Sequence, residues 1–189
     1  MKRIEEAVAY AAKMHAGQTR KMSGMPYILH PMETAVIVTT MTMDEDVIIA
    51  SILHDVIEDT PATEEEVRKM FGERVLELIK SETENKRRDL PASATWRIRK
   101  EESLAELEKS SKDTKILWLA DKLSNIRSMA EQYSKIGDEI FEAFHEKRKS
   151  EHAWYYTRVL EILRNDLSDT FAFKEYERHV NFVFKGEQK

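Results

Sequence analysis

Cysteine is absent from this 189-residue sequence. Disulfide bonds and thiolate-ligated zinc are therefore excluded, and any metal ion would be held by histidine and carboxylate side chains. The chain also lacks an apolar run of the ~18 residues that a membrane-spanning helix needs. Its N-terminal segment, residues 1–17, alternates charged and apolar residues and has no signal-peptide pattern. We expect a soluble, cytoplasmic protein with no membrane partner.

Glycine and proline are scarce, with 5 and 4 residues, whereas hydrophobic residues make up 41% of the chain. This composition supplies enough apolar material for one continuous core, so we predict a single domain over residues 1–189. Acidic residues outnumber basic ones by 35 to 30, which gives a net charge of -5. We expect no nucleic-acid partner, because an anionic ligand would need a local basic pocket.

Apolar residues recur at intervals of three and four, which is the period of an α-helix. Two such runs are Ile4, Ala7, Val8, Ala11 and Ala12, and Ile116, Leu119, Ala120 and Leu123. The pattern predicts an all-α fold, a globular bundle of unequal helices in which short loops make sequential helices neighbours.

Capping residues and helix breakers predict the ends of the first helices. The first helix is expected to run to about His15 and to stop at Gly17. Pro31 suits the first turn of a second helix, because its missing N–H is not needed there. Asp44 is expected to cap a third helix over residues 45–58.

Similar signals predict the helices that follow. Thr63 and Glu66 have the spacing of a capping box, and Asp113 is expected to cap a later helix. Further helical segments are expected at residues 75–80, 96–109, 151–163 and 171–184.

The segment 81–95 is polar, contains Pro91 and lacks a periodic apolar face. We interpret it as a mobile loop near a substrate opening rather than as a linker between domains. An ordinary surface loop is the alternative interpretation.

His54 and Asp55 are adjacent at the end of an apolar helical pattern, where ionisable groups are costly to bury. Helical spacing places Glu58 one turn from His54 and Asp59 one turn from Asp55. A cluster of these four groups suits a cation together with a proton-transfer group.

Two other fragments carry matching chemistry. His30 lies just before a predicted helix start, and Asp121 lies in an apolar helical pattern with Asn125 one turn further on. Two imidazoles and two carboxylates, from His30, His54, Asp55 and Asp121, suit Mn²⁺, Fe²⁺ or Zn²⁺ and leave positions for water and substrate. A structural hydrogen bond is the alternative for any one of these residues alone.

The ordered set H…HD…D resembles the signature of HD phosphohydrolases. Longer words narrow the resemblance to the hydrolase domain of RelA/SpoT homologues, the alarmone (ppGpp) pyrophosphohydrolases, and especially to their small stand-alone members. The matching words are AAKMHAGQTR (11–20), PYILHP (26–31), LHDVIEDT (53–60), FG (71–72) and LADKLSNIR (119–127). HDVIEDT is the most specific of them.

The resemblance implies an HD-domain helical bundle in which the two histidines and two aspartates of the H…HD…D set bind one Mn²⁺ ion. It also implies that Glu58 and Asp59 assist the attacking water and that Asn125 positions the reacting groups. Arg20 and Lys21 resemble the family's nucleotide-holding basic loop, where a guanidinium can stack on a base or bind phosphate through two hydrogen bonds. A solvated charge pair is the alternative for these two residues.

Other positions depart from the family pattern. Arg148 and Glu151 match residues that line the family's nucleotide site, but His152 stands where a tyrosine is usual. Because an imidazole has a smaller stacking face and a titratable ring, base recognition is expected to differ. Ser124 replaces a usual aromatic or imidazole side chain, which changes the shape of the pocket, and residues 81–86 match loosely.

The resemblance implies a metal-dependent (p)ppGpp 3′-pyrophosphohydrolase that releases pyrophosphate and GDP or GTP by attack of metal-activated water. Two alternatives are open: an HD phosphohydrolase acting on an adenosine alarmone, NADPH or a nucleoside phosphate, and a non-catalytic nucleotide sensor. Glu58 and Asp59 argue against the sensor, because binding alone needs no proton-transfer carboxylate. We expect one divalent metal ion and a nucleotide substrate, and a homo-oligomer is left open.

Overall fold

The computed structural model describes residues 2–21, 23–84, 87 and 89–185. Over these residues the regular elements are helices, with one isolated antiparallel bridge between Thr19 and Pro26, so the all-α prediction is confirmed. In chain order the elements are α1 Lys2–Met14, α2 Leu29–Thr39, α3 Glu45–Leu53, α4 Val56–Asp59, α5 Glu64–Phe71, α6 Glu73–Lys80, α7 Ala92–Lys109, α8 Lys112–Ile136, the 3₁₀ helix η1 Gly137–Ala143, α9 Lys149–Leu167 and α10 Phe171–Phe184.

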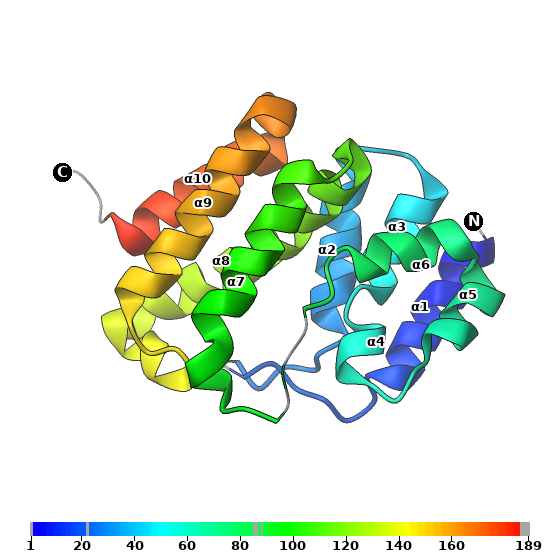
Figure 1. Cartoon of the computed structure of the whole chain (residues 1–189), viewed down its shortest axis with the longest axis horizontal. Helices are drawn as coiled ribbons and strands as arrows, with labels where there is room; N and C mark the ends of the chain where they lie inside the picture. The colour runs from blue at the N-terminus through cyan, green and yellow to red at the C-terminus, as the bar shows by residue number, and fades with distance from the viewer. Residues whose placement is uncertain (1, 22, 85–86, 88, 186–189) are drawn as a thin grey trace.

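Helix α8 organises the bundle. It is 25 residues long and packs against α2, α3, α9, α10 and η1. Figure 1 shows α1 and α3–α6 on one side of the molecule and α9 and α10 on the other, with α2, α7 and α8 between them. Leu117, Leu119 and Leu123 of α8 are fully buried. Each such side chain contributes roughly 1.5–3 kcal/mol through removal of apolar surface from water.

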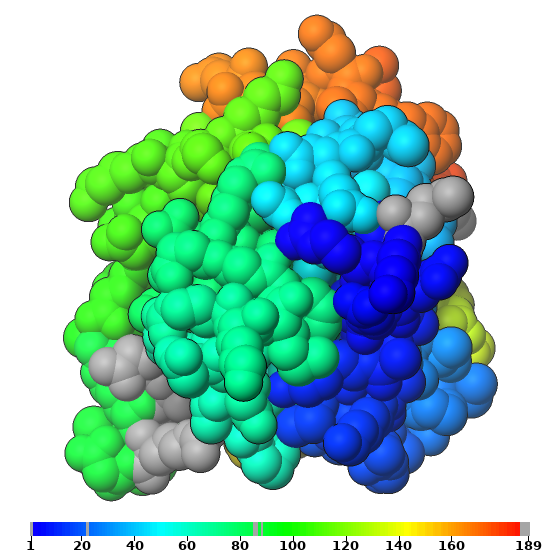
Figure 2. All heavy atoms as spheres, turned by 90° about the vertical axis from the view of Figure 1, so that its right-hand side faces the viewer, coloured from blue at the N-terminus to red at the C-terminus, as the bar shows by residue number. Residues whose placement is uncertain are grey.

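The N-terminal helix closes one end of the bundle. Arg3 donates to the carbonyl oxygen of Phe71 at 2.8 Å, and the rings of Tyr10 and Phe71 meet edge to face with centroids 5.8 Å apart. Figure 2 views this end of the molecule, where the surface of α1 meets that of α5 and α6. Among the described residues, no helix combines the length and apolar character needed to cross a membrane.

Several predicted helix signals are confirmed. The Asp44 side chain accepts a hydrogen bond from Asp46 N and caps α3, and both hydrogen bonds of the capping box are present between Thr63 and Glu66. Pro31 lies in the first turn of α2. After α1, Gly17 has a φ of +80°, a left-handed conformation that side chains other than glycine rarely adopt, so the helix does not continue.

The predicted helix over residues 45–58 is wrong in one respect, because the helix is interrupted at His54 and Asp55. Helix α3 ends at Leu53, and α4 begins at Val56. Asp55 has φ −93° and ψ −5°, the bridge region of backbone space, which is sparsely populated. The break redirects the chain at the two ionisable residues that the sequence had placed on a continuous helix.

Other boundaries are also corrected. Ser111, not Asp113, caps α8, because its hydroxyl accepts from Thr114 N, whereas the Asp113 carboxylate pairs with Arg74 at 2.9 Å. Helix α7 begins at Ala92, so the end of the expected 81–95 loop is helical. Positions 85, 86 and 88 of that loop lie outside the described residues, and its mobility stays a prediction.

Candidate metal centre

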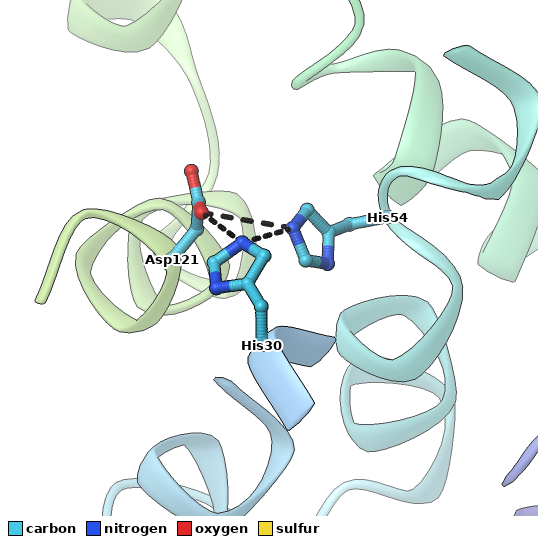
Figure 3. A group of neighbouring side chains, drawn as sticks. All are labelled: His30, His54 and Asp121. Carbon is cyan, nitrogen blue, oxygen red and sulfur yellow. Dashed lines mark hydrogen bonds and ion pairs between the residues drawn. The ribbon is translucent and has the colours of Figure 1, made fainter. Parts of the chain in front are cut away.

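Three packed helices bring the H…HD…D residues together. His30 lies in the first turn of α2, His54 and Asp55 form the turn after α3, and Asp121 lies in the middle of α8. Helices α2, α3 and α8 contact one another in every pairing, which brings these positions to one place. Figure 3 shows the side chains of His30, His54 and Asp121 directed toward each other.

The distances between the facing atoms are those of ligands around a common ion. His30 Nε2 lies 3.0 Å from Asp121 Oδ1 and 3.6 Å from Asp55 Oδ2. His54 Nε2 lies 3.0 Å from Asp55 Oδ2 and 3.6 Å from Asp121 Oδ1, and the two Nε2 atoms are 3.3 Å apart. Ligand atoms held about 2.0–2.2 Å from one metal ion would be about 3.0–3.5 Å apart. His30, His54 and Asp121 could therefore hold a metal ion, and Asp55 borders the same point.

Both imidazoles present their Nε2 atoms to this point because their Nδ1 atoms are engaged elsewhere. His54 Nδ1 lies 2.8 Å from the carbonyl oxygen of Ser51, which can only accept, so Nδ1 carries the hydrogen. His30 Nδ1 lies 2.8 Å from the hydroxyl of Ser124. An imidazole held in this way offers its Nε2 lone pair to a metal ion.

The charges of the centre favour a bound cation. Burial would raise the pKa of Asp121, but Lys122 and the two imidazoles hold it well below its usual value. Burial disfavours a charged His54, yet Asp55 and Asp121 together raise the pKa of its ring. The pKa of His30 is lowered, chiefly by burial. The two carboxylates therefore draw a positive charge to the centre, and a divalent ion would compete there with a proton on His54.

Hydrogen bonds from neighbouring side chains orient the carboxylates of Asp55 and Asp121. Tyr27 Oη donates to Asp55 Oδ2 at 2.5 Å, and Asn125 Nδ2 donates to Asp121 Oδ1 at 2.7 Å. The ammonium of Lys122 pairs with the other oxygen of Asp121. Sequence reasoning missed the roles of Tyr27 and Lys122. Tyr27 lies in the matching word PYILHP and Lys122 in LADKLSNIR, so the family resemblance could have indicated both residues.

The two residues predicted to transfer a proton, Glu58 and Asp59, lie just after the candidate metal ligands in the chain. Glu58 and Asp59 occupy the single turn of α4, immediately after His54 and Asp55. Glu58 Oε2 accepts from the backbone N of Glu84 at 3.3 Å, so α4 is tied to the loop that follows α6.

The two predicted nucleotide-binding residues of the basic loop differ in their surroundings. Arg20 Nη2 donates to Asn125 Oδ1 at 3.2 Å, and its guanidinium lies 5.9 Å from the ring centroid of Tyr27. Arg20 is therefore beside the candidate metal centre. Lys21 is exposed on the loop.

Arg148 and His152 both contact Glu146, and their contact with a nucleotide stays a prediction. Arg148 pairs with Glu146 at 2.8 Å with a side chain that is 66% exposed, and His152 Nε2 lies 2.8 Å from the carbonyl oxygen of Glu146. The buried His152 ring packs against the rings of Trp96, Phe141 and Phe144. This packing favours a structural role for His152 and leaves it without a free stacking face.

Glu82 is a carboxylate near the centre that sequence reasoning missed, since the polar segment around it has no periodic pattern. Both of its carboxyl oxygens are buried and have no hydrogen-bond partner among the described residues. Burial raises the pKa of Glu82 to about 8, and the nearby Asp121 carboxylate adds to this shift. The segment after α6 therefore borders the candidate metal centre, and its place near a substrate opening stays a prediction.

Glu82 predicts an unusual pH dependence of stability in metal-free protein. Its pKa rises from 4.5 in the unfolded chain to about 8 in the folded protein. The folded state then binds the extra proton, so Glu82 lowers the free energy of unfolding as pH rises through this window. We expect Glu82→Gln to stabilise the metal-free protein by roughly 3–5 kcal/mol at about pH 8.5, and by little at about pH 4.5.

Denaturant unfolding of chelator-treated protein across this pH range measures the difference. Glu77→Gln, which removes an exposed carboxylate on the neighbouring α6, is the matched control and should follow the wild type. Parallel stability curves for the wild type and Glu82→Gln would show that Glu82 is not held as a neutral acid.

Comparison with known proteins places this geometry in a family. Residues 7–147 match the HD domain family. Guanosine-3′,5′-bis(diphosphate) 3′-pyrophosphohydrolase of Aquifex aeolicus is 32% identical over 191 residues, which cover 95% of this chain and 25% of that protein. The bifunctional (p)ppGpp synthase/hydrolase SpoT of Escherichia coli K12 is 47% identical over 79 residues, covering 42% of this chain and 11% of that protein. The chain thus spans a quarter or less of the length of these relatives.

Solved structures share the fold over most of the chain. A metazoan ortholog of SpoT, described as hydrolysing ppGpp and playing a role in starvation responses, aligns with a TM-score of 0.75 at 27% identity and covers 96% of this chain and 94% of its own. A protein of Listeria monocytogenes EGD-e aligns with a TM-score of 0.72 at 31% identity, over 82% of this chain and 99% of its own. With its family match extending from the first helix past the last residue of the H…HD…D set, this chain belongs to the HD domain family.

Proposed function

We propose that the chain is a metal-dependent (p)ppGpp 3′-pyrophosphohydrolase, with residues 1–189 acting as a single domain. The observation that carries the proposal is the arrangement of two imidazole nitrogens and two carboxylate oxygens that face one another at distances of 3.0–3.6 Å. The carboxylates of Glu58 and Asp59 follow on the next turn of the chain. The named activities of the Aquifex aeolicus relative and of the metazoan SpoT ortholog support the choice of substrate.

In this proposal His30, His54, Asp55 and Asp121 hold one divalent ion, with Mn²⁺ as the first candidate. Neutral imidazoles and carboxylates are a donor set that suits Mn²⁺, Fe²⁺ and Zn²⁺. When bound, the ion supplies Lewis-acid chemistry by acidifying water and neutralising charge on a phosphoryl oxygen.

The remaining roles belong to the side chains around the centre. Glu58 or Asp59 accepts a proton from the attacking water as the new P–O bond forms and the bond to the 3′-oxygen breaks. The 3′-oxygen gains a proton, so the products are pyrophosphate and GDP or GTP. Asn125 is positioned for this step, because it contacts both Asp121 and the phosphate-binding candidate Arg20.

The basic loop is proposed to hold the nucleotide. The Arg20 guanidinium can bind phosphate through two parallel hydrogen bonds, which a lysine cannot do. Exposed Lys21 adds a positive charge at the entrance. Arg148 and His152 are weaker candidates, because the first is paired with Glu146 and the second is buried among aromatic rings.

The proposal predicts metal-dependent turnover of ppGpp. Protein stripped with a chelator should release nothing, and reloading with Mn²⁺ should restore release of GDP and pyrophosphate in equal amounts. Chromatography of the nucleotides together with a coupled pyrophosphate assay measures both products.

The packing of His152 favours one second candidate, a hydrolase for another nucleotide, because the base-binding surface then differs from the pattern that the resemblance implies. The adenine counterpart of ppGpp and NADPH are therefore assayed in parallel. Faster turnover of either one than of ppGpp would replace the proposed substrate and leave the metal centre in place. Binding of ppGpp without turnover by the Mn²⁺-loaded protein would instead favour a nucleotide sensor.

A further inference from the structure

Ser124 on α8 joins His30 to a charged network that extends away from the metal centre. Its fully buried hydroxyl lies 2.8 Å from His30 Nδ1 and donates to Glu33 Oε2 at 2.7 Å. The other oxygen of Glu33 accepts from Arg127 Nη1 at 2.9 Å. The Arg127 guanidinium also donates to both oxygens of Glu175 on α10, at 3.0 and 2.5 Å.

The hydrogen positions in this network follow from counting donors. A serine hydroxyl has one hydrogen, and the Glu33 carboxylate can only accept it. The Ser124 oxygen must therefore accept from His30, which places a hydrogen on Nδ1 and leaves the Nε2 lone pair directed toward Asp121 and His54. The network selects one of the two tautomers of His30.

The two histidines differ in what holds their rings. His54 at the end of α3 uses the carbonyl oxygen three residues earlier, that of Ser51, which belongs to the same helix. His30 lies in the first turn of α2, where the carbonyl oxygen three residues earlier, that of Tyr27, accepts from His30 N at 2.9 Å. The partner of the His30 ring is a side chain from another helix, that of Ser124 on α8.

We propose that Ser124, Glu33 and Arg127 form a positioning relay that sets the tautomer and orientation of His30 and thereby the affinity of the centre for its metal ion. The inference rests on the proposed function for the presence of the ion. The single hydroxyl of Ser124 both accepts from His30 and donates to Glu33, which a phenylalanine or tryptophan at this position could not do. Helices α2 and α8 carry the relay, and Glu175 of α10 holds Arg127 through two hydrogen bonds.

Mn²⁺ affinity is the first measurement, made by competition with a chromogenic chelator. Ser124→Ala leaves Nδ1–H of His30 without its acceptor, so we expect Mn²⁺ to bind about 10- to 100-fold more weakly. Glu33→Gln keeps the size of the side chain but removes the charge that receives the Ser124 hydrogen and pairs with Arg127, so it should also weaken binding.

Glu131→Gln is the matched control. This substitution also removes one negative charge, but from an exposed residue one turn beyond Arg127 on α8. Glu131 and Arg127 both line an open cavity of about 1020 Å³ between α8 and α10. Mn²⁺ affinity should stay within about twofold of the wild type, because this carboxylate pairs with Lys135 and has no link to His30 in the network.

A spectroscopic measurement separates positioning from a general loss of structure. In protein loaded with diamagnetic Zn²⁺, the Nδ1–H groups of His30 and His54 should give two protected imidazole resonances. Ser124→Ala should shift or broaden only the His30 resonance, and the His54 resonance serves as an internal control because its acceptor is a backbone carbonyl.

The outcomes distinguish the relay from the metal centre on which it rests. Wild-type Mn²⁺ affinity and an unchanged His30 resonance in both Ser124→Ala and Glu33→Gln would overturn the relay while leaving the metal centre intact. Failure of the wild type itself to bind Mn²⁺ or Zn²⁺ would overturn the metal centre. If Ser124→Ala does not fold, the folded Glu33→Gln protein still decides the question by the same two measurements.

Discussion

Replacing Asp121 by asparagine is expected to abolish ppGpp hydrolysis, with kcat/KM lower by a factor on the order of 10³ or more, equal to several kcal/mol of lost transition-state stabilisation. Asp121 Oδ1 faces both imidazoles, at 3.0 Å from His30 and 3.6 Å from His54. Asparagine has nearly the same shape but no charge. Mn²⁺ binding by chelator competition should be lost together with turnover.

The same substitution should also destabilise the protein, which allows a sharper test. Lys122 is half-buried beside Asp121, and removing the charge of Asp121 leaves the ammonium without its ion-pair partner, at a cost of about 3 kcal/mol. Adding Lys122→Met removes that charge and should restore much of the unfolding free energy without restoring hydrolysis. Asp113→Asn, at a half-buried position in the first turn of α8 where the carboxylate pairs with Arg74, is the control and should remain active.

Recovery of both stability and turnover in the Asp121→Asn/Lys122→Met protein would show that the carboxylate has only a structural role. Retention of Mn²⁺ binding in Asp121→Asn would likewise contradict its assignment as a ligand.

Replacing Glu58 by glutamine is expected to lower kcat by about 10²- to 10⁴-fold, the usual contribution of a positioned general base. The amide oxygen of glutamine can still accept from Glu84 N, the contact that the Glu58 carboxylate makes at 3.3 Å, so the local fold should be kept. Mn²⁺ affinity should change little, because Glu58 is not among the proposed ligands. Initial rates and chelator competition measure the two quantities separately.

Asp59→Asn tests which of the two adjacent carboxylates accepts the proton. The variant that lacks the proton acceptor should lose the acidic limb of the kcat profile against pH, whereas the other should keep it. Glu64→Gln, on the exposed first turn of α5, is the matched control. Wild-type kcat in both Glu58→Gln and Asp59→Asn would require a different route for the proton.

Local signals in the sequence predicted several helix ends correctly and failed where packing decides. Asp44 and the Thr63–Glu66 pair act within a single turn of the chain, so their spacing was sufficient to predict the caps. The break at His54 has no comparable local signal, because apolar periodicity continues through it. The extra helical turn at Ala92 was likewise hidden in a polar segment.

The candidate site was partly predictable for a related reason. His30, the His54–Asp55 pair and Asp121 lie in short words with specific spacing, and the structure brings them together. Correspondence with a position of the family's nucleotide site did not predict the surroundings of every side chain. His152 occupies a position expected to contact nucleotide, yet its neighbours along the fold make it a packed, buried ring.

The sequence by itself determined the helical class, several of the caps and the set of residues that meet at the candidate metal centre, because periodicity and short words depend on neighbours in the chain. Only the tertiary structure decided that Ser124 joins His30 to Glu33, which lies 91 positions before Ser124, and that the carboxyl oxygens of Glu82 are buried near Asp121. These features arise where α2, α8 and the segment after α6 pack together. Contacts between distant segments carry no periodic pattern, so they become visible only once the helices are in place.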